Sequence, residues 1–107
     1  MATARTATAL LVDDDPASRR ANQERLEDKG YCVVLAHDET EALSRVRQSA
    51  PNVIFVHLVA TGLGNLPFVQ ALRSDDVCRH IPVVLITDHY DVDVKQSRLR
   101  AVYREGW

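Results

Sequence analysis

The chain has 107 residues, of which 46% are hydrophobic and 26% are charged, and its formal net charge is −2. These values predict one small globular domain and give no reason to expect binding to nucleic acid or to anionic membranes. No apolar stretch is close to the length of a membrane-spanning helix, about 20 residues. Residues 1–9 lack the apolar core of a signal peptide. Neither Cys32 nor Cys78 has a metal-ligand spacing, so we expect reduced thiols and a cytoplasmic location.

Short apolar runs alternate with helical patterns along the chain, after a flexible tail at residues 1–7. We predict strands at 9–12, 31–35, 53–56 and 81–86, and helices at 16–29, from 39 to before Pro51, at 66–73, and around Leu99 and Val102 up to Gly106. This alternation implies an α/β fold with a doubly wound parallel sheet and right-handed crossovers. Because we recognise only four such units before Trp107, we expect a fifth strand and a fifth helix to be absent.

Residues at the ends of the predicted helices support their placement. Asp15 is expected to cap the first helix, with Pro16 at its first position and Gly30 ending it in a left-handed turn. Asp38, followed by Glu41, resembles a capping box at the start of the second helix.

The apolar side of the first predicted helix is thin. It consists of Leu26 and two small residues, Ala17 and Ala21. Asn22 and Arg25 stand where a core helix usually carries larger apolar groups.

Polar residues follow three of the predicted strands. Asp13 and Asp14 follow the first strand, His57 follows the third and Thr87 follows the fourth. Ligands of open parallel sheets bind outside the carboxyl ends of the strands, so we expect these residues at one functional edge. Adjacent carboxylates suit a hard divalent cation. The alternative is a solvated acidic turn in which Asp15 serves only as a helix cap.

Five segments resemble, in order and with natural spacing, the receiver domain of bacterial two-component response regulators. They are Leu11–Pro16, Gly30–Tyr31, Glu41–Leu43, Pro51–Arg73 and Ile81–Thr87. The resemblance implies a flavodoxin-like fold with strand order 2-1-3-4-5. It also implies Mg²⁺-dependent transfer of a phosphoryl group from a histidine kinase to an aspartate.

The resemblance also implies roles for residues at the strand ends. Asp13 and Asp14 match the family's acidic pair, which binds Mg²⁺, and the carbonyl of Val59 matches a main-chain metal ligand. Thr87 matches the switch hydroxyl that bonds the phosphoryl group. We expect either no cofactor or, if an ion binds to these ligands, Mg²⁺ or a transition metal.

Three departures from the family pattern predict that phosphoryl transfer is lost. His57 occupies the phospho-acceptor position, where the family has Asp, and an imidazole cannot form an acyl phosphate. Asp88 replaces the small residue that usually follows the switch hydroxyl. The family's Lys has no counterpart, because it follows the fifth strand and the chain is expected to end before it. We therefore predict a pseudo-receiver without enzymatic activity.

Three roles for His57 are open. As a pocket-filling residue, it would bond to Asp13 or Asp14, whose carboxylates satisfy the ring; this role is favoured. As a metal ligand, it would join the two carboxylates in a site suited to Zn, Mn or Fe. As an acceptor, it would itself be phosphorylated, without a neighbouring Lys to neutralise the charge.

The leading functional hypothesis is a degenerate receiver that acts as a protein-interaction module, independent of phosphorylation, with a histidine kinase or an output protein as partner. The alternatives are a working phosphorelay receiver that uses Asp13, Asp14 or Asp88 as acceptor, and a regulatory domain that binds a divalent metal. A haloacid-dehalogenase-like phosphatase would need a downstream Lys, a second acidic pair and a cap domain, for which 107 residues leave no room.

A homodimer is also predicted. Without a fifth strand, residues 83–86 would form an unpaired sheet edge, which templates pairing with another chain. Without a fifth helix, the sheet would expose apolar side chains from Val53 to Val56. Both features would favour self-association through the fourth strand and fourth helix.

Overall fold

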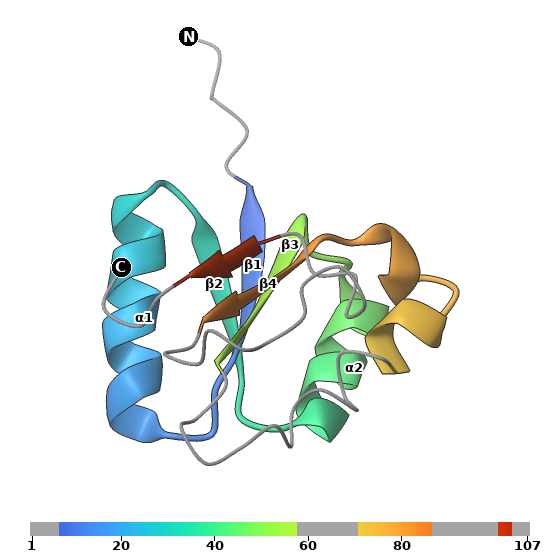
Figure 1. Cartoon of the computed structure of the whole chain (residues 1–107), viewed down its shortest axis with the longest axis horizontal. Coiled ribbons are helices and arrows are strands. Elements are labelled where there is room, and N and C mark those ends of the chain that lie inside the picture. The colour runs from blue at the N-terminus through green and yellow to red at the C-terminus, as the bar shows by residue number, and fades with distance from the viewer. Residues whose placement is uncertain (1–6, 58–70, 87–100, 104–107) are drawn as a thin grey trace, which may run out of the picture.

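The computed structural model describes residues 7–57, 71–86 and 101–103 (Figure 1). The described elements are β1 (Thr8–Val12), α1 (Pro16–Asp28), β2 (Cys32–Ala36), α2 (Glu39–Gln48), β3 (Val53–His57), the 3-10 helix η2 (Cys78–His80), β4 (Val83–Ile86) and β5 (Ala101–Tyr103). None of the helices in these ranges has the length and apolar character that crossing a membrane requires.

The strands form one sheet in the order β2-β1-β3-β4-β5, and every pair is parallel. This order confirms the flavodoxin-like topology that the family resemblance implied. In the register of the sheet, Val12 lies beside Val56, and His57 lies beside Ile86. The carboxyl ends of β1, β3 and β4 therefore meet at one edge, as the alternation of strands and helices predicted.

The expected absence of a fifth strand is wrong. Ala101–Tyr103 form β5 and pair with residues 84–86 of β4. We interpreted the spacing of Leu99 and Val102 as helical, but a run of three residues is too short to show a period, and Val and Tyr favour strands. Residues 104–107, where a fifth helix would begin, lie outside the described part of the chain.

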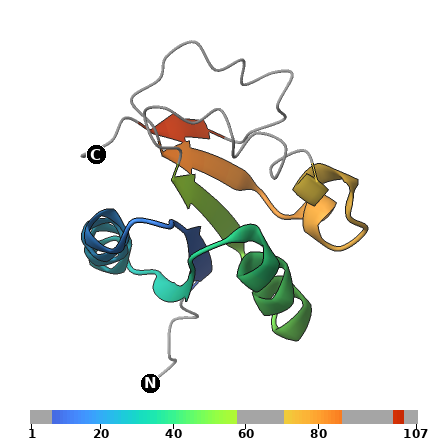
Figure 2. The same cartoon turned by 90° about the horizontal axis from the view of Figure 1, so that it is seen from below.

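The core lies on both faces of the sheet, with α1 and α2 on opposite sides (Figure 2). On the α2 side, Ala42 and Val46 pack with Leu10, Ile54 and other buried residues of the central strands. On the α1 side, Leu26 packs in a second cluster that includes Phe55. The ring of Phe55 also meets that of Tyr31 edge to face, with centroids 5.6 Å apart. Strands buried on both faces explain the continuous apolar runs in the sequence.

The structure contradicts both reasons given for a homodimer. β4 lies between β3 and β5, so its backbone edge is paired. The side chains from Val53 to Val56 are at most 8% exposed, so they form no uncovered apolar surface. The homodimer thus stays a prediction that neither argument supports any longer.

Acidic residues cap both helices at their N-termini, as predicted. Asp15 Oδ2 accepts a hydrogen bond from the Ser18 N–H at 3.1 Å, and Asp38 Oδ1 accepts one from the Glu41 N–H at 2.8 Å. The Glu41 carboxylate accepts a bond from the His37 N–H, at 2.8 Å, which differs from the return bond to the cap residue in a capping box. The second helix therefore begins where it was predicted to begin. Its Glu41 carboxylate bonds to the N–H of His37, one residue before the cap residue Asp38.

The turn after α1 requires glycine, as predicted. Gly30 has a φ of 99°, in the left-handed region that side chains with a Cβ rarely adopt. The next N–H, that of Tyr31, donates back to the Leu26 carbonyl at 3.1 Å and so ends the helix.

Arg73 connects the end of a helical segment to the chain that enters β4. Residues 71–74 are helical, in agreement with the end predicted for the third helix. The Arg73 guanidinium donates hydrogen bonds to the carbonyls of Cys78, Arg79 and Ile81 at 2.9, 3.2 and 2.5 Å. One side chain therefore binds three carbonyl groups of the connection. β4 begins at Val83, two residues later than predicted.

Candidate functional site

The candidate site centres on a buried carboxylate and a buried imidazole at the ends of neighbouring strands. Asp13 follows β1 and His57 ends β3, and their exposed fractions are 1% and 4%. His57 Nδ1 lies 3.3 Å from Asp13 Oδ1. The sequence predicted both residues at this edge, and their contact agrees with the role of His57 as a residue that fills the pocket.

Two polar residues of α1 complete this site. The Ser18 hydroxyl donates to Asp13 Oδ2 at 2.7 Å, and its Oγ lies 3.4 Å from His57 Nε2. The Asn22 amide donates to Asp13 Oδ2 at 3.5 Å and to Ser18 Oγ at 3.3 Å. Ser18, Asn22 and Leu26 are each four residues apart, so they share the inward stripe of the helix. We call Asp13, Ser18, Asn22 and His57 the Asp13 cluster.

Backbone and arginine contacts hold the Asp13 cluster in place. The Asp15 N–H donates to Asp13 Oδ1 at 3.0 Å. Arg19 Nη1 donates to the Asp13 carbonyl at 3.1 Å, and Arg25 Nη1 donates to Asn22 Oδ1 at 3.0 Å. Each carboxylate oxygen of Asp13 thus faces two nitrogen or oxygen donors of this chain.

Both ring nitrogens of His57 lie near oxygen atoms of the Asp13 cluster. Ser18 uses its single hydroxyl proton on Asp13, so it meets His57 Nε2 as an acceptor. Nδ1 faces the negatively charged Asp13 Oδ1, which attracts a proton to that position. Burial raises the pKa of the Asp13 carboxyl, but the hydrogen bonds from His57, Asp15 and Ser18 and the positive charge of His57 outweigh burial and leave that pKa lowered.

The combination of Ser18, His57 and Asp13 resembles a catalytic triad in composition only. In a triad, the serine hydroxyl donates to the imidazole, which accepts its proton. Here the hydroxyl donates to the carboxylate, so its proton is not shared with the imidazole. The arrangement therefore does not activate the Ser18 hydroxyl as a nucleophile.

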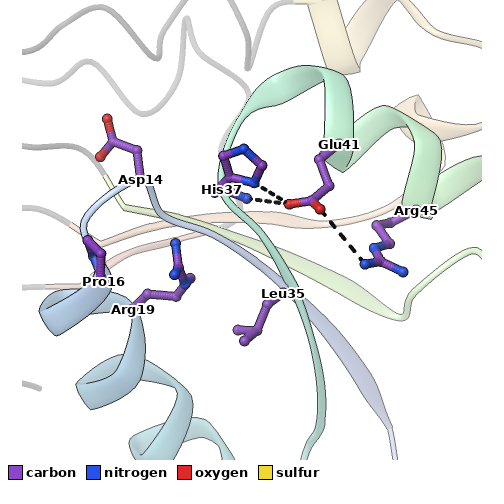
Figure 3. A pocket seen from close by; sticks show the side chains of 7 residues that line it. All are labelled: Asp14, Pro16, Arg19, Leu35, His37, Glu41 and Arg45. Carbon is purple, nitrogen blue, oxygen red and sulfur yellow. Dashed lines mark hydrogen bonds and ion pairs between the residues drawn. The ribbon is translucent and has the colours of Figure 1, made fainter.

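Asp14 does not join the Asp13 cluster. Its side chain is exposed and lines a groove between α1 and α2, together with Glu41 and Arg45 (Figure 3). Within residues 7–57 and 71–86, no three His, Cys, Asp or Glu side chains are grouped so that they could hold a metal ion. Two other predicted site residues, Val59 and Thr87, lie outside the described residues.

The described residues do not fit the Mg²⁺ ion that the receiver resemblance implies. A hard cation needs several oxygen ligands, including carboxylates that are open to it. Both oxygens of Asp13 already accept hydrogen bonds within the chain, Asp14 lies apart, and a nitrogen base stands at position 57. In this arrangement the imidazole ring of His57 lies beside Asp13, 3.3 Å from Oδ1.

Acid is expected to weaken the fold through Asp13. The lowered pKa of Asp13 stabilises the folded chain above the unfolded-state value, about pH 4, and this contribution is lost as pH falls through the folded-state value. We therefore expect the stability advantage of the wild type over Asp13→Asn to shrink as pH falls below about 4.

Urea unfolding of both proteins at several pH values below 5 measures this advantage. Glu41 and Asp75, whose pKa values are also lowered, are present in both proteins and cancel in the comparison. A difference in unfolding free energy that stayed constant with pH would contradict the prediction.

Comparisons with known proteins agree with the topology of the sheet. A family model described as the response regulator receiver domain matches residues 9–104. Response regulator PleD of Caulobacter vibrioides is 34% identical over 82 residues, which are 77% of this chain and 18% of PleD. Response regulator MprA of Mycobacterium avium is 33% identical over 94 residues, which are 86% of this chain and 40% of MprA. The chain thus spans less than half the length of either relative.

A solved structure shows the same fold. It is the receiver domain of sensor histidine kinase PA1611 from Pseudomonas aeruginosa, with a magnesium ion coordinated in its active site cleft. It matches with a TM-score of 0.79 at 18% identity, over 96% of this chain and 88% of that chain.

Proposed function

Since the chain belongs to the response regulator receiver family, we propose that it is a degenerate receiver, which acts in two-component signalling as a protein-interaction domain independent of phosphorylation. One observation carries this proposal. The residue at the end of β3, where the family pattern has the acceptor aspartate, is His57, and its ring is engaged with Asp13 and Ser18.

The charges of Asp13 and His57 explain why this edge of the sheet does not need a phosphorylation cycle. In the family pattern, several carboxylates share one site, and Mg²⁺ offsets their repulsion. We propose that a protonated His57, whose Nδ1 lies 3.3 Å from Asp13 Oδ1, offsets the charge of Asp13, while Ser18 binds the second oxygen. We infer that the domain holds one arrangement of this edge and presents a constant surface to its partner.

The fifth strand corrects one of the three departures inferred from the sequence. The residue that follows β5 is Arg104, so the position after that strand is not missing and carries a cation. The side chain of Arg104 lies outside the described residues. A guanidinium at this position supplies positive charge but no phospho-acceptor, so the proposal rests on His57 and not on a missing Lys.

The finer assignments remain proposals. We propose a histidine kinase or an output protein as the partner, a cytoplasmic location, no enzymatic activity, and no requirement for Mg²⁺ or another metal. A homodimer is retained only as a prediction.

Phosphorylation is tested directly by incubating the protein with Mg²⁺ and acetyl phosphate and measuring its intact mass. We expect no gain of one phosphoryl group, because the imidazole of His57 cannot form an acyl phosphate and Asp13 is buried. A receiver domain with an aspartate acceptor, treated in parallel, is the positive control. A stoichiometric adduct on the wild-type chain would overturn the proposal, and a peptide map would then show whether the exposed Asp14 is the acceptor.

A further inference from the structure

A groove of about 490 Å³ lies between the first turns of α1 and α2, on the side of β1 away from β3 (Figure 3). We call it the α1–α2 groove. Its lining residues come from the ends of two strands and the starts of two helices: Asp14, Pro16, Arg19, Leu35, His37, Glu41 and Arg45. The groove includes no member of the Asp13 cluster.

One of the two carboxylates that line the groove, that of Glu41, already has partners within the chain. Glu41 Oε1 accepts hydrogen bonds from the N–H of His37 at 2.8 Å and pairs with the ring Nδ1 of His37 at 2.7 Å. Glu41 Oε2 lies 3.8 Å from Arg45 Nη2, at the long end of ion-pair distances. In Figure 3 the Asp14 carboxyl points away from Leu35 and Arg45.

The positive groups of the groove keep most of their hydrogen-bonding capacity. A guanidinium has five N–H donors. Within the described part of the chain, Arg19 uses one on the Asp13 carbonyl, and Arg45 makes only its long ion pair with Glu41. Arg19 and Arg45 stand on opposite sides of Leu35 (Figure 3). Two sets of spare donors therefore flank an apolar floor.

We propose that the α1–α2 groove binds an acidic segment of a partner protein, with carboxylates on Arg19 and Arg45 and the aliphatic part of a side chain on Leu35. The unused donors of Arg19 and Arg45 favour this occupant, because carboxylates match the planar donor sets of arginine. The open shape of the groove suits a chain segment better than a small molecule, which proteins usually enclose. The identification of the occupant as a signalling partner rests on the proposed function.

The probe is a fluorescein-labelled hexaglutamate peptide, whose binding is followed by anisotropy at low ionic strength. We expect saturable binding to the wild type and about tenfold weaker binding to Arg45→Gln and to Arg19→Gln, as lost charge-assisted hydrogen bonds imply. Arg47→Gln is the matched control, because Arg47 is on the same helix and pairs outside the groove with Asp75 at 3.6 Å. It removes the same charge and should leave binding unchanged. Circular dichroism shows whether each variant is folded.

A charge-reversal variant provides a second test of the groove. Arg45→Glu should lose binding of hexaglutamate and gain binding of a labelled hexalysine peptide. Absence of wild-type binding, or equal weakening by Arg47→Gln and Arg45→Gln, would overturn the groove as a specific site. Displacement by free glutarate as effectively as by unlabelled peptide would show a small dicarboxylate site and overturn the partner assignment. A phosphoryl adduct would refute the proposed function without affecting these binding results, so the two failures are distinguishable.

Discussion

Replacement of His57 by leucine is expected to lower the free energy of unfolding by about 3 kcal/mol, because it leaves a buried carboxylate without its cationic neighbour. Asp13 and His57 have almost no exposed surface, and Nδ1 lies 3.3 Å from Oδ1. Leucine has a similar volume, so the loss comes mainly from charge and not from a cavity. Urea unfolding at pH 6 measures the change. His80→Leu is the control, since His80 is exposed and its loss should cost less than about 0.5 kcal/mol.

A double-mutant cycle separates the pair from the general cost of each substitution. Asp13→Asn removes the charge of the carboxylate and keeps its shape. If Asp13 and His57 stabilise the fold as an ion pair, the double variant should be less destabilised than the sum of the two single variants, by at least about 1 kcal/mol. Additive effects would show that the two side chains do not interact in solution, and the charge argument for the degenerate site would then be wrong.

Arg73→Met is expected to destabilise the domain by about 2 kcal/mol, the range measured for hydrogen bonds that involve a charged group. Methionine keeps the aliphatic stem and removes the donors that bind the carbonyls of Cys78, Arg79 and Ile81. Those carbonyls precede β4, so their release should loosen the entry into the sheet. Thermal unfolding or urea unfolding measures the loss.

Arg73→Lys distinguishes geometry from charge. An ammonium group is a compact donor and cannot reproduce the planar set of N–H groups that reaches three carbonyls. We expect Arg73→Lys to recover less than half of the stability lost in Arg73→Met. Arg79→Met, which changes an exposed side chain of η2, is the control for removing one positive charge from this region. Wild-type stability in Arg73→Lys would show that charge alone is sufficient.

Much of the fold could be predicted from local signals. The N-caps Asp15 and Asp38 and the turn at Gly30 are each decided by residues within four positions of one another, so the sequence displays them directly. The strand β5 was not predicted because it has only three residues and one of them, Val102, also fits a helical spacing with Leu99. Pairing with β4, which is a long-range contact, decides its conformation.

The candidate site was only partly predictable for a similar reason. Asp13 and His57 were expected together because they follow adjacent strands. Asp14 was assigned to the same site, yet it lines the α1–α2 groove, since side chains of consecutive residues at a strand end point in different directions. The sequence indicated only that Asn22 is a polar residue on the side of the first helix that faces the core. The role of Asn22 depends on its contact with Asp13, which follows a neighbouring strand and cannot be inferred from the helix sequence alone.

The saturated hydrogen bonding of Asp13 limits how this domain could regain a phosphorylation cycle. His57→Asp alone would supply an acceptor, but it would also place two carboxylates against each other in a buried site. Ser18 and Asn22 would still bind Oδ2 and keep it from a metal ion. We therefore expect reactivation to require changes on both β3 and α1. Such coupling makes the loss of the acceptor difficult to reverse by single substitutions, in evolution as in protein engineering.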